Sequence, residues 1–334
     1  MTLSSTTITN ARRIAFGPQD KLMNMSKVKF QWAVDIHETM LSNFWTEKAV
    51  PMGGDKLCYR NVLSDVEQNA FDKALAFVSN LDGIQFNNLI HNIGSCITAP
   101  EVSGAIARQA AEEYLHVRAY QTMIEAISLD PELVYTAFER DGLLAAKNAH
   151  IMAQSDILKG EPTPANFARA VVGNIIMEGV YFYSAFLVFG SFAQNGKMLA
   201  SADMIKYIAR DEGGTHLELF SRIHSTFKME NPHLYDEAFK ADARTMFIDA
   251  VAMEVQWGIH IIGPGFQGMT AAVMEGFVKT VANMRWEILY PGEVLYPEAR
   301  DTAPWFFPFF KINGGRANFF ETKPTDYSVS GLEW

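Results

Sequence analysis

A glutamate and a histidine three residues apart, Glu113 and His116, lie in a long run of helix-forming residues. On a helix this spacing places a carboxylate and an imidazole on one face, where both can reach a common metal ion. Tyr120 follows one turn later on the same face, so a phenol would lie beside that ion. A solvated helix face shows the same pattern, so its weight depends on ligands from other helices.

Three further segments carry acidic or imidazole groups in apolar surroundings. Asp82 follows a run of apolar residues, Glu178 lies inside a more apolar run, and Glu212 and His216 share a third segment. Considered singly, Asp82 fits a helix end or the surface, and Glu212 fits an ion pair with Arg210 or contact with water. Together, two helices with one carboxylate and two with a Glu/His pair match the pattern by which a four-helix bundle holds two metal ions.

The donor types indicate which metals such a site would take. Oxygen donors with one imidazole per ion favour iron or manganese, whereas thiolates would favour zinc or copper. Four carboxylates neutralise two divalent ions, and without metal several of them would take up protons. Five other histidines have no carboxylate at ligand spacing in a comparable setting and are interpreted as structural or exposed: His91, His150, His224, His233 and His260.

The elements that must position these residues are helices. Apolar residues recur with helical spacing, and turn residues separate the runs. The sequence predicts helices over 28–45, 64–100, 101–128, 131–158 (one or two), 166–192, 198–227, 233–262 and 269–289. No segment alternates as strands do, so the predicted fold is all-α, a single helical bundle. The polar first thirty residues are expected on the surface, and the stretch from 290 onward has no period.

Composition bounds the class of protein. The 334 residues are 49% hydrophobic, enough for a substantial core, and we expect one domain over 1–315 with a tail over 316–334. The net charge of −10 argues against nucleic acid as a partner. Cys58 and Cys96 suggest neither a zinc site nor a disulfide framework.

One apolar stretch, 171–192, is long enough to cross a membrane. It contains Asn174 and Glu178, and an ionised glutamate in lipid is costly, so the interpretation is a core helix rather than a membrane span. The N-terminus lacks a basic segment followed by an apolar one, so no signal peptide is expected and the protein is predicted to be cytoplasmic.

The chain resembles the small, radical-generating subunit of class I ribonucleotide reductase, a ferritin-like helical bundle, over about residues 44–327. The resemblance rests on Asn43-Phe44-Trp45, Asp82, Glu113-x-x-His116-x-x-x-Tyr120, residues 178–186, residues 208–212, Arg285, Pro304-Trp305 and residues 318–327.

The resemblance implies a role for each matching residue. One metal ion would bind Asp82, Glu113 and His116, the other Glu178, Glu212 and His216, with Glu113 and a second carboxylate able to bridge. Reaction of the reduced dimetal site with O2 would oxidise Tyr120 to a stable tyrosyl radical. An apolar pocket would shield that radical, and its matching residues are Phe182, Phe186 and Ile208.

A relay and a docking tail are also implied. Trp45 and Asp211, with His116, would carry the oxidising equivalent toward the surface, and Tyr327 in the tail would be the next station. The end of the tail would dock on the large catalytic subunit, where ribonucleoside diphosphates are reduced. A homodimer is implied, with iron preferred because Tyr120 can be oxidised directly; a manganese form would imply a flavoprotein activator.

The fourth helix departs from the family pattern. The family usually places this Glu and His three apart, but Glu212 and His216 are four apart, with Gly213 and Gly214 between them. A single-turn π-bulge would absorb the extra residue. The two glycines weaken an α-helix by roughly 1 kcal/mol each.

Two rival functions remain open on the sequence. One is another ferritin-like dimetal oxidase or oxygenase that acts on its own bound substrate. The other is a metal-storage bundle without catalysis. Tyr120, Trp45 and Tyr327 together favour the radical-generating subunit, because neither rival needs a radical phenol, a relay or a docking tail.

Overall fold

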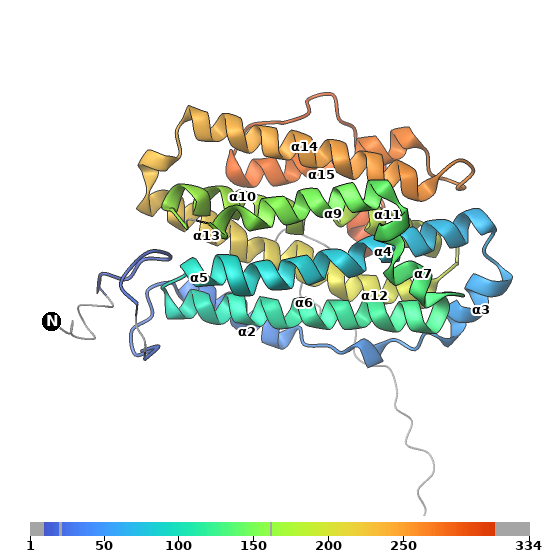
Figure 1. The fold of residues 1–334 in the computed structure, drawn as a ribbon, viewed down its shortest axis with the longest axis horizontal. Coiled ribbons are helices and arrows are strands. Elements are labelled where there is room, and N and C mark those ends of the chain that lie inside the picture. The colour runs from blue at the N-terminus through green and yellow to red at the C-terminus, as the bar shows by residue number, and fades with distance from the viewer. Residues whose placement is uncertain (1–9, 20–21, 161, 311–334) are drawn as a thin grey trace, which may run out of the picture.

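A computed structural model describes residues 10–19, 22–160 and 162–310 of the chain (Figure 1). Within these ranges the chain forms helices and no strand, apart from one isolated antiparallel bridge between Ala15 and Ile97. The all-α prediction is therefore confirmed.

The long α-helices run in this order: α2 (Gln31–Ser42), α3 (Gly53–Asn61), α4 (Asp65–Asn87), α6 (Pro100–Ile127), α9 (Gly142–Ser155), α10 (Pro164–Gly179), α11 (Tyr183–Gln194), α12 (Leu199–Arg210), α13 (Leu217–Glu230), α14 (Glu237–Ile262) and α15 (Ala271–Leu289). Shorter pieces are η1 (Glu47–Ala49), η2 (Asn88–Ile93), α5 (Gly94–Cys96), α7 (Pro131–Tyr135), α8 (Ala137–Arg140), η3 (Asp156–Leu158), η4 (Asp211–His216), η5 (Pro232–Leu234) and α16 (Phe306–Phe310).

The long helices pack lengthwise into a bundle. In Figure 1, α4 and α6 run side by side along the long axis, with α9 and α10 above them and α14 and α15 at the upper edge. Helices α10 and α11 lie inside, and their residues are almost all buried. The 18-residue window apolar enough to cross a membrane belongs to this stretch and is entirely buried, which confirms its interpretation as a core segment.

The apolar stretch is not the single helix predicted over 166–192. It breaks after α10, and α11 begins four residues later. Arg285 of α15 donates from Nε to the carbonyl oxygen of Gly179 at 3.2 Å, and the Ser184 N–H donates to Oε1 of Glu254 at 2.9 Å. Side chains of α14 and α15 therefore bond backbone groups at the two helix ends, so the break is stable inside the core.

Other boundaries also differ from the predictions. The predicted helix 131–158 is divided into α7, α8, α9 and η3, α3 was not predicted, and α16 follows a stretch without period. The N-terminal segment does not only cover the surface. Arg12 is 1% exposed and pairs with Glu101 of α6 at 3.1 Å.

Candidate metal centre

Four helical segments bring the predicted ligands together at the centre of the bundle. Asp82 comes from α4, Glu113 and His116 from α6, Glu178 from the last turn of α10, and Glu212 and His216 from η4, and all six side chains are fully buried.

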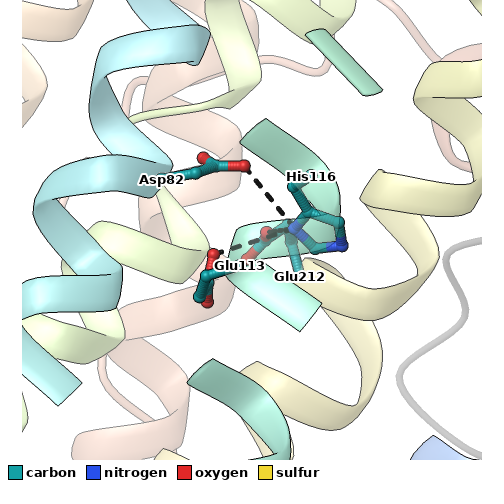
Figure 2. A group of neighbouring side chains, drawn as sticks. All are labelled: Asp82, Glu113, His116 and Glu212. Carbon is teal, nitrogen blue, oxygen red and sulfur yellow. Dashed lines mark ion pairs between the residues drawn. The ribbon is translucent and has the colours of Figure 1, made fainter. Parts of the chain in front are cut away.

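The six residues form two overlapping groups of potential ligands. In each group, one donor atom per residue lies within 4.8 Å of the others; the first is Asp82, Glu113, His116 and Glu212, and the second is Glu113, Glu178, Glu212 and His216. Figure 2 shows the first group, with its side chains pointing toward one another. Glu113 and Glu212 belong to both groups, so their carboxylates lie within reach of both.

Both imidazoles turn the same nitrogen toward the carboxylates. Nδ1 of His116 lies 2.8 Å from Oε1 of Glu212, and Nδ1 of His216 lies 3.1 Å from Oε2 of Glu212 and 3.3 Å from Oε1 of Glu113. The two ring centroids are 5.6 Å apart. Nδ1 is therefore the atom that each histidine offers to a metal ion.

The four-residue spacing of Glu212 and His216 is accommodated by a π-helix. Segment η4 is a single π-helical turn between α12 and α13, as the spacing predicted. A π-helix closes i→i+5 hydrogen bonds, so its turn holds one residue more than an α-helical turn. Glu212 and His216, four residues apart in the π-helix, thus lie on one face. Glu113 and His116, three residues apart in an α-helix, do the same.

Burial and mutual repulsion shift the pKa values of the carboxyl groups in the cluster. Burial raises the pKa of Asp82 and of Glu178 well above the usual range, and neighbouring carboxylates add to the shift. Burial would also raise the pKa of Glu212, but the charge of His216 and hydrogen bonds hold it well below that range. Raised pKa values of Asp82 and Glu178 agree with the expectation that several of these acids carry protons when metal is absent.

The histidines compensate part of this charge. Burial disfavours the charged imidazole, yet the hydrogen bond with Asp211 and the neighbouring carboxylates of Asp82, Glu113 and Glu212 raise the pKa of His116 well above its ordinary value. For His216, burial is likewise outweighed by the charge of Glu212 and by bonds to further glutamates. The carboxylates around each ring therefore favour the charged form of both imidazoles.

Several carboxylate oxygens of the cluster accept no hydrogen bond from the described residues. Among the described residues, no donor bonds either oxygen of Asp82, Oε2 of Glu113 or Oε2 of Glu178, although all are buried. Unpaired buried carboxylate oxygens are costly unless a cation or proton satisfies them. The donor set of carboxylates and two imidazoles therefore fits a pair of hard divalent or trivalent ions.

Two glutamines that the sequence analysis missed hold one of the ligands. Gln85 and Gln109 both donate from Nε2 to Oε1 of Glu178, Gln109 at 2.7 Å, while Oε2 of Glu178 faces the second ligand group. Gln85 lies three residues after Asp82, and Gln109 four residues before Glu113. This spacing places each glutamine on the same helix face as Asp82 or Glu113, but it does not indicate a contact with Glu178 of another helix.

The structure brings Trp45, Asp211 and His116 into contact. The indole Nε1 of Trp45 donates to Oδ2 of Asp211 at 2.7 Å, and the same oxygen lies 3.3 Å from Nε2 of His116. Burial would raise the pKa of Asp211, but its bond with His116 and the charge of Arg210 lower it. The indole ring also stacks on His116 at 5.9 Å and on Tyr207 at 5.2 Å between centroids.

Tyr120 is fully buried, and its hydroxyl has no hydrogen-bond partner among the described residues. Burial and the nearby charges of Asp82, Glu212 and Glu113 raise its pKa well above 10, so the group stays a phenol.

The residues predicted to shield Tyr120 belong to the same hydrophobic core. Phe182, Phe186 and Ile208 are all fully buried, and the rings of Phe182 and Phe186 stack with centroids 5.5 Å apart. Tyr327 and the tail anchors Leu332 and Trp334 lie outside the described residues.

Comparison with known proteins gives one consistent result. The profile of the family described as "Ribonucleotide reductase, small chain" matches residues 22–302. The ribonucleoside-diphosphate reductase subunit beta of Treponema pallidum is 31% identical over 326 residues, covering 96% of this chain and 91% of that protein. The protein of the same name from Halalkalibacterium halodurans is 29% identical, covering 97% and 94%.

A solved structure agrees with the sequence comparisons. The ribonucleotide reductase R2 subunit from Clostridium botulinum superposes with a TM-score of 0.85 at 33% identity, covering 89% of this chain and 94% of that one. The residues matched by the family profile, 22–302, include the helical segments that carry the six potential ligands.

Proposed function

The chain belongs to the small-chain family of ribonucleotide reductases, and on that premise we propose that it generates a radical at Tyr120 and passes the oxidising equivalent to a large catalytic subunit. The observation that supports this most is the meeting of two four-donor groups in a core that also buries a phenol with no hydrogen-bond partner among the described residues. The large subunit would use that equivalent to reduce ribonucleoside diphosphates.

The ligands of the two ions follow from the two groups. One ion would be held by Asp82, Glu113 and His116 and the other by Glu178, Glu212 and His216, with Glu113 and Glu212 in reach of both. When bound, the metal pair supplies a one-electron oxidation driven by O2. Iron is the proposed metal because Tyr120 can then be oxidised directly; with manganese, the protein would need a flavoprotein activator.

The surroundings of Tyr120 suit a long-lived radical. Its ring is 0% exposed, and we assign Phe182, Phe186 and Ile208 to the pocket that keeps water and reductants away. A radical is quenched by proton and electron donors that reach it, so an apolar, water-free pocket prolongs its lifetime. The hydroxyl without a bonding partner among the described residues fits this role.

The relay is proposed along Trp45, Asp211 and His116. Asp211 accepts the indole N–H of Trp45 and faces His116 with the same oxygen, so one carboxylate joins a redox-active ring to a potential ligand. Electrons would move inward along these residues when Tyr120 is reduced. Tyr327 is the proposed next station, and the tail 316–334, with Leu332 and Trp334 as anchors, is proposed to dock on the large subunit.

The remaining proposals concern assembly and location. We propose a single ferritin-like domain over 1–315, a homodimer, and a cytoplasmic location.

Electron spin resonance after addition of ferrous iron and O2 tests the function. We expect an organic radical signal that narrows when the tyrosine rings are deuterated, and two iron ions per chain by metal analysis. Tyr120→Phe should keep both ions and lose the signal. A wild-type protein with two ions and no radical would refute the proposal, and oxidase activity that persists in Tyr120→Phe would favour another ferritin-like oxidase. Metal analysis of the purified protein decides between iron and manganese.

A further inference from the structure

Each of the two imidazoles faces a second carboxylate with the nitrogen that points away from the ligand groups. Nε2 of His116 lies 3.3 Å from Oδ2 of Asp211, and Nε2 of His216 lies 3.0 Å from Oε2 of Glu112. Asp211 directly precedes Glu212, and Glu112 directly precedes Glu113. The two halves of the site are therefore built alike, although only Asp211 was expected from the sequence.

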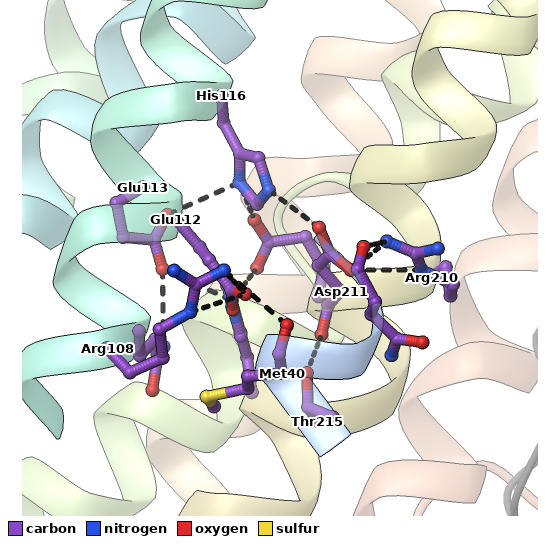
Figure 3. A network of polar contacts seen from close by, with 12 residues as sticks. Met40, Arg108, Glu112, Glu113, His116, Arg210, Asp211 and Thr215 are labelled. Atoms are coloured by element: carbon purple, nitrogen blue, oxygen red, sulfur yellow. Dashed lines mark hydrogen bonds and ion pairs between the residues drawn. The ribbon is translucent and has the colours of Figure 1, made fainter. Parts of the chain in front are cut away.

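An arginine holds the other oxygen of each carboxylate. Arg108 donates from Nε and Nη2 to Oε1 of Glu112 at 3.1 and 2.9 Å, and Arg210 donates in the same way to Oδ1 of Asp211 at 3.0 and 2.8 Å. In each pair both N–H groups donate to a single carboxylate oxygen, and these charge-assisted bonds hold that oxygen in place and leave the other oxygen to face the imidazole. Figure 3 shows these two arginine–carboxylate pairs, Arg108–Glu112 and Arg210–Asp211, which we call the two arms of the site.

The two arginines are anchored on neighbouring backbone carbonyls. Nη2 of Arg108 donates to the oxygen of Met40 at 3.4 Å, and Nη2 of Arg210 donates to that of Asn43 at 2.6 Å. Both carbonyls lie at the C-terminal end of α2, where free carbonyls need donors. Glu112 itself is only 3% exposed, so its bonds to Arg108 and His216 are largely shielded from water.

The two arms differ in one respect. Trp45 bonds to Asp211, whereas the guanidinium carbon of Arg108 lies 5.8 Å from the ring centroid of Phe44. A phenylalanine is not a practical electron carrier at protein potentials, so this contact does not extend a relay. The contact of Glu112 with His216 points instead to an effect on the imidazole.

His216 also lies in a segment with weak local support. It ends the π-helical turn η4, which contains Gly213 and Gly214, and glycines lower the stability of a helix. A carboxylate on the far nitrogen of a ligand histidine fixes the tautomer and the ring plane and makes the imidazole a better donor. Glu112 comes from α6, which is regular through this region, so it supplies from outside what η4 lacks.

We propose that Glu112, held by Arg108, is a positioning residue that fixes His216 with Nδ1 toward the second metal ion, and that binding of this ion depends on it. The proposal rests on the proposed dimetal function. It assigns Glu112 a role in loading one of the two positions and none in the transfer of electrons.

Titration of metal-free protein with Mn(II), followed by the spin resonance signal of free Mn(II), tests it without any activity assay. Wild-type protein should bind two ions per chain. Glu112→Ala should weaken one of the two sites by about 10–100-fold, the usual effect of losing such a partner, and leave the other unchanged. Glu112→Gln should weaken it less, because its amide oxygen can still accept the Nε2–H bond. Arg108→Ala should have a smaller effect at the same site.

Glu101→Gln is the matched control. Glu101 is also a buried, arginine-paired glutamate of α6, but its partner is Arg12, far from the ligands, so this variant should keep both Mn(II) sites. The proposal is overturned if folded Glu112→Ala binds two ions with wild-type affinity, or if both sites weaken equally. A wild-type protein that binds fewer than two ions would instead refute the dimetal function itself.

Discussion

Deleting Gly214 should return the fourth ligand segment to an ordinary α-helix without moving the helices on either side. In η4 each N–H pairs five residues back, and after loss of one residue the same N–H groups can pair four residues back. The register between α12 and α13 is then preserved. Glu212 and the histidine become three residues apart, as Glu113 and His116 already are.

The structure gives the expected magnitude. A side chain at Gly214 would meet nothing within 4 Å, so removing this residue loses no packing. One glycine less in a helix is worth about 1 kcal/mol, so the free energy of unfolding should stay equal or rise by up to ~1 kcal/mol. Both Mn(II) sites should be kept.

A second deletion provides the control. Glu218 is an exposed residue of α13, close to Gly214 in sequence, but it lies in regular α-helix. Its deletion turns all later residues of α13 by about 100° and shifts them by about 1.5 Å. Phe220, Ile223 and Phe227, all nearly fully buried, would leave the core, at a cost of about 1.5–3 kcal/mol each. That loss approaches the whole stability of a typical domain.

Urea unfolding of the metal-free variants and Mn(II) titration measure both effects. The expected result is a folded, two-metal protein for the deletion of Gly214 and an insoluble or unfolded one for the deletion of Glu218. If the two deletions are equally damaging, or if loss of Gly214 abolishes one metal site in a folded protein, then η4 is not a one-residue insertion into an α-helix and the reasoning is wrong.

Three further predictions concern other buried groups. Lys147→Met should lower the free energy of unfolding by about 3–5 kcal/mol in a urea titration, because it leaves Glu254 buried without its ion-pair partner, and the effect should shrink if Glu254→Gln is added. Burial lowers the pKa of His224 to about 4, below the value near 6.5 expected in the unfolded chain. Between these two pH values the unfolded chain binds a proton that the folded chain does not, so the free energy of unfolding should fall by about 3 kcal/mol as the pH drops from 6.5 to 4. In His224→Gln, unfolding measured over the same pH range should show a smaller fall. Trp45→Phe keeps an aromatic ring but loses the bond to Asp211, worth about 1.5–3 kcal/mol; the Tyr120 radical should still form, while deoxynucleotide formation with the large subunit should fall to background. Full turnover by this variant would contradict the relay.

Much of the metal site was readable from residue spacing. Glu113 and His116 share a face because three residues make nearly one helical turn, and that relation holds wherever the helix lies. The departure of Glu212 and His216 from the family's spacing of three suggested a π-bulge, because such a bulge absorbs one extra residue in a helix. Asp82 and Glu178 were identifiable because a carboxylate in an apolar run requires a partner.

The break between α10 and α11 was not readable. The segment is apolar throughout, and periodicity within it gives no reason to stop. The break is stabilised because Arg285 and Glu254 form hydrogen bonds with backbone groups at the two helix ends, and these residues come from helices far along the chain.

The sequence by itself therefore determined the six potential ligands and the phenol, because each is marked either by its spacing within one helix or by the apolar residues around it. Only the tertiary structure decided what surrounds them: Glu112 on His216, and Gln85 and Gln109 on Glu178. Contacts between helices depend on how far each helix is rotated and shifted against its neighbours. That relation is set by packing of the whole core and leaves no periodic trace in the chain.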